Sequence, residues 1–202
     1  MDLVQQIAIG AGLAWASGIR LYAALFLAGI LGRFGFIELP PGLHVLMHPL
    51  VLGASGCMFL LEFFADKIPG FDSAWDAVHT FIRIPAGAVL AAATFSDVDP
   101  ALMLAAGLVG GTIASGSHLT KAGGRALINT SPEPFSNWLA SFTEEAAVLG
   151  GLWAMFLHPV AFLVLLALFL CFAAWLLPRL WRGARMLAQR LGAGRAVPRR
   201  AD

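Results

Sequence analysis

Long apolar stretches, separated by short polar segments, run along most of the chain. The apolar windows cover residues 3–32, 46–65, 72–97, 100–120, 137–157 and 159–178. A helix of about 20 predominantly apolar residues is long enough to cross the hydrocarbon core of a membrane. We therefore predict an all-α fold, a polytopic transmembrane helix bundle of about six spans over residues 1–178.

Two of these windows lack the pattern of a straight span. The window 3–32 is too long and contains Arg20 and several glycines, and the window 72–97 begins with polar residues and contains Pro85. Proline inside a helix removes a backbone hydrogen bond, and an arginine at membrane depth needs a partner. We expect broken, tilted or partly re-entrant segments here, so four full spans plus half-helices is an alternative.

A short, similar sequence occurs in the first and fourth windows. The string Ala-Ser-Gly-Ile-Arg-Leu at 16–21 resembles Ala-Ser-Gly-Ser-His-Leu at 114–119. Each string begins a block of three windows, and two such blocks, 1–98 and 99–178, would have opposite orientations in the membrane. This predicts a possible 3+3 inverted repeat, from which many transporters build a central site. The alternative is that small residues simply recur in glycine-rich membrane helices.

The composition supports a membrane protein and excludes two other classes. Hydrophobic residues make up 59% of the 202 residues and charged residues 12%, whereas soluble domains carry about 25% charged residues. An ordinary soluble enzyme and a disordered chain are therefore excluded.

Basic residues gather at the C-terminal end. Seven of the thirteen lie in 179–202, namely Arg179, Arg182, Arg185, Arg190, Arg195, Arg199 and Arg200. We interpret this segment as a basic cytoplasmic tail facing anionic lipid. It has no folded module around it, so we expect no nucleic-acid partner. Lys67, Lys121 and Arg125 lie in loops on the same side of a six-span protein, which predicts that both termini are cytoplasmic.

Charged residues within or near the apolar windows form one dense cluster around a predicted helix break at Pro69 and Gly70. The cluster contains Glu62, Asp66, Asp72, Asp76, His79 and Arg83. The last four follow at i, i+4, i+7 and i+11, which places them on one helix face. This stripe suits a divalent cation or a proton relay. Alternatively, the charges neutralise one another, Asp72 caps a helix and Asp66 pairs with Lys67.

A second cluster follows a polar, proline-broken loop. Asn137, Ser141 and Glu144 share one helix face, whereas the adjacent Glu144 and Glu145 should point in different directions. Arg20 and His118 are further polar residues at depth. We expect Arg20 to be the counter-ion of a buried acid. The alternative is a clamp for an anion, formed by Arg20, Arg83, Lys121 and Arg125.

One short motif raises the question of catalysis. Gly53-Ala54-Ser55-Gly56 is similar to the Gly-x-Ser-Gly motif of intramembrane rhomboid proteases, but it lies in an early span. The same Ala-Ser-Gly string occurs twice more, which indicates helix packing. We therefore expect no enzyme and no cofactor, with a Ser55–His118 hydrolase or a metal-dependent hydrolase as the minor alternative. Whether a metal binds stays open.

Three strings resemble those of a catalogued family. They are Ala65-Asp66-Lys67-Ile68-Pro69, Asp72-x-x-Trp75-Asp76-x-x-His79-Thr80-Phe81 and Ser131-Pro132-Glu133-Pro134-Phe135-Ser136-Asn137. They resemble a bacterial membrane family known as domain of unknown function 4126, over about residues 8–178. The resemblance implies an integral protein of the bacterial inner membrane and implies no activity.

The function we predict is that of a small transporter or channel-like protein, moving a cation or a proton-coupled solute through a central polar site. The predicted site residues are Asp72, Asp76, His79, Glu144, Glu62, Asp66, Asn137, Arg20, Arg83 and His118. Binding or transport of an anionic lipid or lipid-linked phosphate is an alternative, as is a non-catalytic membrane assembly protein. The expected partners are the lipid bilayer, an ion or small solute, and further copies of the chain in a homo-oligomer.

Overall fold

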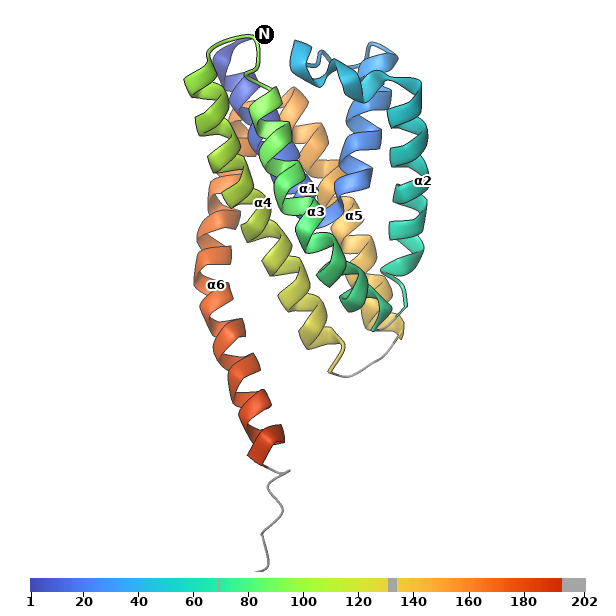
Figure 1. Ribbon diagram of the computed structural model, residues 1–202, viewed down its shortest axis with the longest axis vertical. Helices are drawn as coiled ribbons and strands as arrows, with labels where there is room; N and C mark the ends of the chain where they lie inside the picture. The colour runs from blue at the N-terminus through green and yellow to red at the C-terminus, as the bar shows by residue number, and fades with distance from the viewer. Residues whose placement is uncertain (69, 131–133, 194–202) are drawn as a thin grey trace, which may run out of the picture.

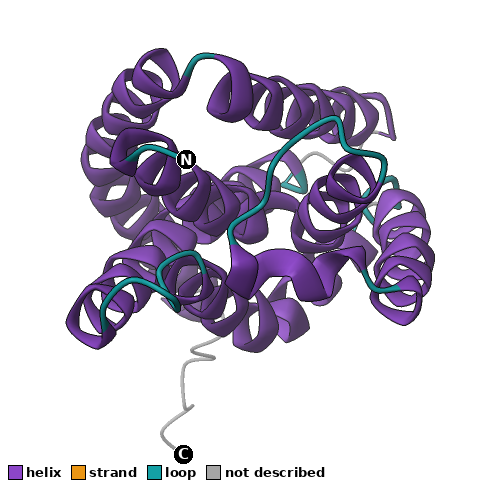
Figure 2. Ribbon diagram, turned by 90° about the horizontal axis from the view of Figure 1, so that it is seen from above, coloured by secondary structure: helices purple, strands orange, loops and turns teal. Residues whose placement is uncertain are grey.

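The computed structural model describes residues 1–68, 70–130 and 134–193, and this part of the chain is helical and contains no strand (Figures 1 and 2). The elements are α1 (Leu3–Arg33), the short 3₁₀ helix η1 (Pro41–Met47), α2 (Pro49–Ala65), α3 (Phe71–Ala93), α4 (Pro100–Ile128), α5 (Pro134–Leu157) and α6 (Pro159–Ala193). The predicted all-α bundle is confirmed.

Proline marks the start of several helices. Pro49, Pro100, Pro134 and Pro159 are the first residues of α2, α4, α5 and α6. Proline suits this position because its fixed φ is helical and its missing N–H would have no partner there. At α4 the Asp99 side chain also accepts hydrogen bonds from the backbone N–H groups of Ala101 and Leu102. Local chemistry thus sets these boundaries.

Helix α1 is a hairpin of two half-helices that meet at Arg20. Arg20 has non-helical φ and ψ values of −145° and 80°, and Figure 1 shows the chain descending to this point and returning. Gln5 donates a hydrogen bond to the Met155 carbonyl (3.1 Å), and Arg33 donates one to the Met47 carbonyl (3.1 Å). Residues from both ends of α1, including Gln6 and Gly32, line the same pocket, so the two ends lie close together.

This hairpin changes the topology that the sequence predicted. Among the described residues, α1, α4 and α6 are long and apolar enough to cross a membrane, and the bent pair η1 and α2 would add a fourth. Six spans are therefore not confirmed. Because α1 turns back, the N-terminus and the far end of α6 lie at opposite ends of the bundle (Figure 1), instead of on one side.

The predicted 3+3 repeat is likewise not confirmed. The first window turns back at Arg20, whereas its proposed counterpart α4 is one continuous helix. The two similar sequences, residues 16–21 and 114–119, instead pack against each other. A Cβ atom added at Gly18 would collide with Ser117 Oγ and with the backbone of Ala114. The small residues therefore serve close helix contact, as the alternative reading held.

Two further predicted boundaries differ from the structure. Helix α3 continues through Pro85, so the third window is not broken. Membrane helices tolerate proline when neighbouring helices support the freed backbone, and α3 packs along α1 and α4. Helix α6 continues through Pro178 to Ala193, so the predicted tail 179–202 begins as helix. Residues 194–202, with Arg195, Arg199 and Arg200, lie outside the described residues.

Candidate functional site

In the described part of the chain, eleven charged side chains form one continuous ion-pair network around the tip of the α1 hairpin. Its members, which we call the tip network, are Arg20, Glu62, Asp66, Lys67, Asp72, Asp76, Arg83, Lys121, Arg125, Glu144 and Glu145. They come from α1, the α2 end and α2–α3 turn, α3, α4 and α5. Eight of the eleven are buried, and Lys67, Glu144 and Glu145 are partly exposed. Burial this extensive is sustainable only because the charges are paired.

Arg20 connects the hairpin tip to α2 and α5. One of its nitrogens, Nη2, lies 2.9 Å from Asp66 Oδ2, 3.5 Å from Glu144 and 3.4 Å from Glu145. The same nitrogen donates a hydrogen bond to Ser141 Oγ at 2.8 Å. Because Arg20 is the residue at which the helix breaks, its side chain projects from the tip instead of packing along a helical face. The predicted role as counter-ion to a buried acid is what the geometry shows.

Arg83 bridges two buried carboxylates. Its Nη2 lies 2.5 Å from Glu62 Oε1, and its Nη1 lies 2.6 Å from Asp76 Oδ1. Within the described part of the chain, the second oxygens of both acids, Glu62 Oε2 and Asp76 Oδ2, are buried without a hydrogen-bond partner. One guanidinium therefore serves two carboxylates whose outer oxygens remain unsatisfied.

Lys121 joins the two sides of the network. Its Nζ lies 3.0 Å from Asp66, 3.4 Å from Asp76 and 3.4 Å from Glu144. It also donates a hydrogen bond to the carbonyl of Ile19 at 3.1 Å. That carbonyl is at the end of the first half-helix of α1, where carbonyl groups lose their helical partners and the helix dipole favours a cation. The break in α1 thus creates part of the lysine site.

Arg125 and two asparagines hold the end of α4 against α5. Arg125 Nε donates to Glu144 Oε1 at 2.8 Å, and Nη1 donates to Asn137 Oδ1 at 3.1 Å. Asn137 in turn donates to Asn129, whose own amide donates to Asp72 Oδ1 (both within 2.9 Å). Asp72 therefore belongs to this amide chain, and the residue preceding α3 is Gly70, without a side-chain cap. The predicted capping role of Asp72 is wrong.

The two histidines lie beside the tip network and not in its ion pairs. His79 Nδ1 is 2.8 Å from the Trp75 carbonyl, and its ring stacks on Trp75. His118 Nε2 is 2.7 Å from Thr80 Oγ1. Ser55 donates instead to the carbonyl of Val51. Each member of the proposed Ser55–His118 pair thus has another partner.

One family model matches most of the chain. The family model described as "Domain of unknown function (DUF4126)" matches residues 7–179. The chain belongs to the DUF4126 family. No curated protein matches, and no solved structure matches. The match covers all eleven network residues of this DUF4126 chain, and the description of the family assigns no function to them.

The structure of the DUF4126 chain brings the ten predicted site residues to one end of the bundle. Nine of them are buried, and Glu144 is partly so. Four network residues were not among the ten predicted site residues, namely Lys67, Lys121, Arg125 and Glu145, although Lys121 and Arg125 belonged to the alternative anion clamp. Lys67 pairs with Glu145 at 3.4 Å and not with Asp66. Glu144 and Glu145 both contact Arg20, so the expectation that they diverge is wrong.

The tip network carries unequal numbers of opposite charges. It contains six carboxylates and five cationic groups, so its formal charge is −1 when every carboxylate is ionised. Asp66 lies just beyond α2, and burial would raise its pKa. Lys121, Arg20 and Arg125 outweigh that effect, so the pKa of Asp66 falls below its ordinary value. Among the described ion pairs, Glu62 contacts Arg83 alone and shares it with Asp76, so the excess negative charge lies nearest these two acids.

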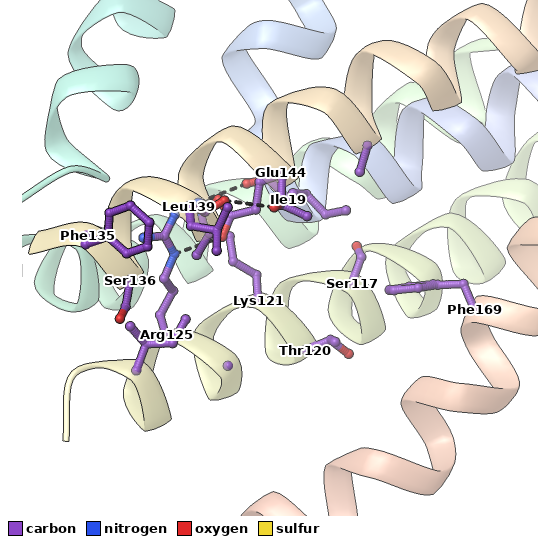
Figure 3. A pocket seen from close by; sticks show the side chains of 15 residues that line it. Ile19, Ser117, Thr120, Lys121, Arg125, Phe135, Ser136, Leu139, Glu144 and Phe169 are labelled. Carbon is purple, nitrogen blue, oxygen red and sulfur yellow. Dashed lines mark hydrogen bonds and ion pairs between the residues drawn. The ribbon is translucent and has the colours of Figure 1, made fainter. Parts of the chain in front are cut away.

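A cavity of about 550 Å³ opens beside the network between α4 and α5 (Figure 3). Lys121, Arg125 and Glu144 form its charged side, whereas Phe135, Leu139 and Phe169 of α6 contribute apolar walls. Within the described residues, no group of three or more His, Cys, Asp or Glu side chains is arranged to hold a metal. The acidic stripe is thus engaged by arginine and lysine, and the geometry gives no support to a metal centre.

Proposed function

We propose that this DUF4126 protein is a proton-coupled membrane transporter whose proton site is the tip network. The observation that carries the proposal is the surplus of one carboxylate over the cations among the described residues of a continuous, largely buried network. An uncompensated charge at this depth is costly, so the network favours binding of one proton. A broken helix that places polar groups among packed helices is a common feature of transporter sites.

The bound proton is best placed on the pair of acids that share Arg83. Within the described residues, Glu62 contacts one cation, Arg83, which it shares with Asp76, whereas Asp76 also lies 3.4 Å from Lys121. Within the described residues, both acids have a buried oxygen without a hydrogen-bond partner. Asp66 and Asp72 do too, but Asp66 contacts two cations, and Asp72 accepts hydrogen bonds from Ser73 and Asn129. Protonation of either acid makes the summed charge of Glu62, Asp76 and Arg83 zero. Loss of the proton restores the negative charge, which changes the electrostatic potential in the rest of the network.

The charge pattern also supports an orientation. Lys67, Arg125 and the start of the basic segment at Arg179 lie at one end of the bundle, whereas Glu38 and Asp99 lie in the segments at the other end. The positive-inside rule places the first end in the cytoplasm. The tip network is then nearest the cytoplasmic side, and the N-terminus lies outside. The homo-oligomer remains a prediction.

The test is proton uptake into proteoliposomes that contain a trapped pH-sensitive dye. A potassium diffusion potential supplies the driving force, and Glu62→Gln and Asp76→Asn are compared with Glu38→Gln. Glu38 is exposed and lies far from the tip network, so it is a matched control. We expect uptake with the unmodified chain and the control, and loss of uptake in both network variants. Equal rates in all four proteins would favour the alternative of a non-catalytic assembly protein.

A further inference from the structure

We propose that the cavity between α4 and α5 binds an amphipathic anion, with an acidic headgroup at Arg125 and Lys121 and an apolar chain between the helices. This inference rests on the proposed function, because it names the substrate class that the proton would accompany. The cavity is about 550 Å³, which is within the usual range for small-molecule sites.

The charges around the cavity favour an anion at this end of the network. Glu144 is the acid that lines the cavity, and it contacts three cations: Arg20, Lys121 and Arg125. At the other end, one cation, Arg83, contacts two acids. The four cations around the cavity side, Arg20, Lys67, Lys121 and Arg125, thus balance the four acids Asp66, Asp72, Glu144 and Glu145, and the surplus carboxylate lies at Glu62 and Asp76. An anion and a proton would bind at different ends.

Arg125 retains an unused hydrogen-bond donor. Its Nε and Nη1 donate to Glu144 and Asn137, but within the described part of the chain its Nη2 has no partner. Arg125 is 2% exposed and lines the cavity, and Figure 3 shows its side chain reaching from α4 toward α5. A buried N–H without an acceptor is costly, and a guanidinium pairs well with carboxylate or phosphate oxygens. An acidic headgroup would satisfy this donor.

The walls of the cavity suit an apolar chain that enters from the bilayer. Ile128, Leu139 and Phe135 line one part, and Phe169 of α6 lines another. Phe135 is 75% exposed and Leu139 is 59% exposed. Large apolar side chains this exposed on a transmembrane bundle face lipid. A ligand can therefore approach sideways, keeping its chain in lipid while its headgroup reaches Arg125.

Gly124 offers a way to fill the cavity without touching the ion pairs. It lines the cavity, and a Cβ atom added there meets nothing within 4 Å. Gly150 on α5 has equally open space and does not line the cavity, so it is a matched control. Gly124→Phe should occlude the site, whereas Gly150→Phe makes the same change on another lipid-facing surface.

The experiment measures binding of defined amphiphiles to the purified full chain in uncharged detergent by native mass spectrometry. The probes are palmitate, phosphatidylglycerol and, as a reference without net charge, phosphatidylcholine. We expect one or both acidic probes to bind to the unmodified chain better than the reference does. The affinity for these probes should fall at least about tenfold in Gly124→Phe and stay unchanged in Gly150→Phe. Preference for palmitate identifies a carboxylate headgroup, and preference for phosphatidylglycerol identifies a bilayer phosphate.

Two results would overturn the inference: binding of the acidic probes no better than phosphatidylcholine, or equal binding to the Gly124→Phe and Gly150→Phe proteins. The assay needs no gradient and no transport. Intact binding together with absent proton uptake would therefore reject the proposed function and leave the anion site standing. Proton uptake that is sensitive to Glu62→Gln, without binding, would reject only the anion site.

Discussion

Arg20 Nη2 lies 2.9 Å from Asp66 Oδ2, and both side chains are completely buried. The same Asp66 oxygen lies 3.0 Å from Lys121 Nζ. One carboxylate oxygen therefore joins the tip of the α1 hairpin, the turn after α2 and the last third of α4. A half-helix that ends inside a bundle has unpaired carbonyls and, here, a charged residue to accommodate. Asp66 pairs with the charge of Arg20, and Lys121, held by the same oxygen, donates to the Ile19 carbonyl.

Removing the Asp66 charge should destabilise the protein strongly. Asp66→Asn keeps the shape of the side chain but leaves Arg20 and Lys121 without their shortest ion pair. Loss of one partner from a buried ion pair costs about 3–5 kcal/mol. The measurement is the unfolding free energy in detergent. Asp97→Asn, at an exposed position near the other end of the bundle, is the control and should have little effect. Equal stabilities of the two variants would contradict this role.

The same residue should contribute to acid sensitivity. Burial would raise the pKa of Asp66, but Lys121, Arg20 and Arg125 lower it below its ordinary value of 3.8. A carboxylate whose folded pKa is depressed stabilises the fold above the unfolded pKa, and this contribution is lost as pH falls through the folded pKa. We therefore expect stability to decrease below about pH 4. The Asp66→Asn protein should lack this component; an identical pH profile would show that other groups cause the loss.

Close packing at Gly18 should be intolerant of even one methyl group. A Cβ atom there would lie 2.8 Å from the His118 backbone nitrogen and closer still to the Ala114 carbonyl oxygen. Backbone atoms cannot move aside locally, so Gly18→Ala should separate α1 from α4 and lower the thermal unfolding temperature by several degrees. Gly53→Ala, where the space is open, should be neutral or stabilising by up to about 1 kcal/mol. Similar unfolding temperatures for the two variants would refute the tight contact.

Helix periodicity predicted much of the site but not its electrostatics. The spacing of Asp72, Asp76 and Arg83 placed them on one face of α3, as the structure has them. Lys121 was assigned to a loop because a basic residue near a span end usually lies in the interface. In fact it is drawn inward by Asp66 and by the Ile19 carbonyl. That carbonyl is free because α1 breaks at Arg20; the sequence indicated a break there, but not that Lys121 would reach the carbonyl.

The largest difference between prediction and structure concerns the topology, and it also originates in the break of α1 at Arg20. Hydropathy cannot distinguish a long span from two half-helices that return, since both bury an apolar sequence. Arg20 and the surrounding glycines indicated a break in the first window, but the direction of the chain after the break depends on contacts with α2. Phe26 stacks on Phe59, and Gly56 packs against Phe26. These contacts bring the second half-helix back along α2.

The hairpin can be tested directly by cysteine labelling from one side of the membrane. Leu3 and Phe36 flank α1 and are 58% and 75% exposed. After Cys57 and Cys171 are replaced by serine, Leu3→Cys and Phe36→Cys should both react with a membrane-impermeant maleimide added outside intact cells. Gly183→Cys, on α6 at the opposite end of the bundle, should react only after the membrane is permeabilised. If α1 instead crossed the membrane, Leu3→Cys and Phe36→Cys would be labelled from opposite sides. That result would remove the structural basis for placing Arg20 at a buried tip.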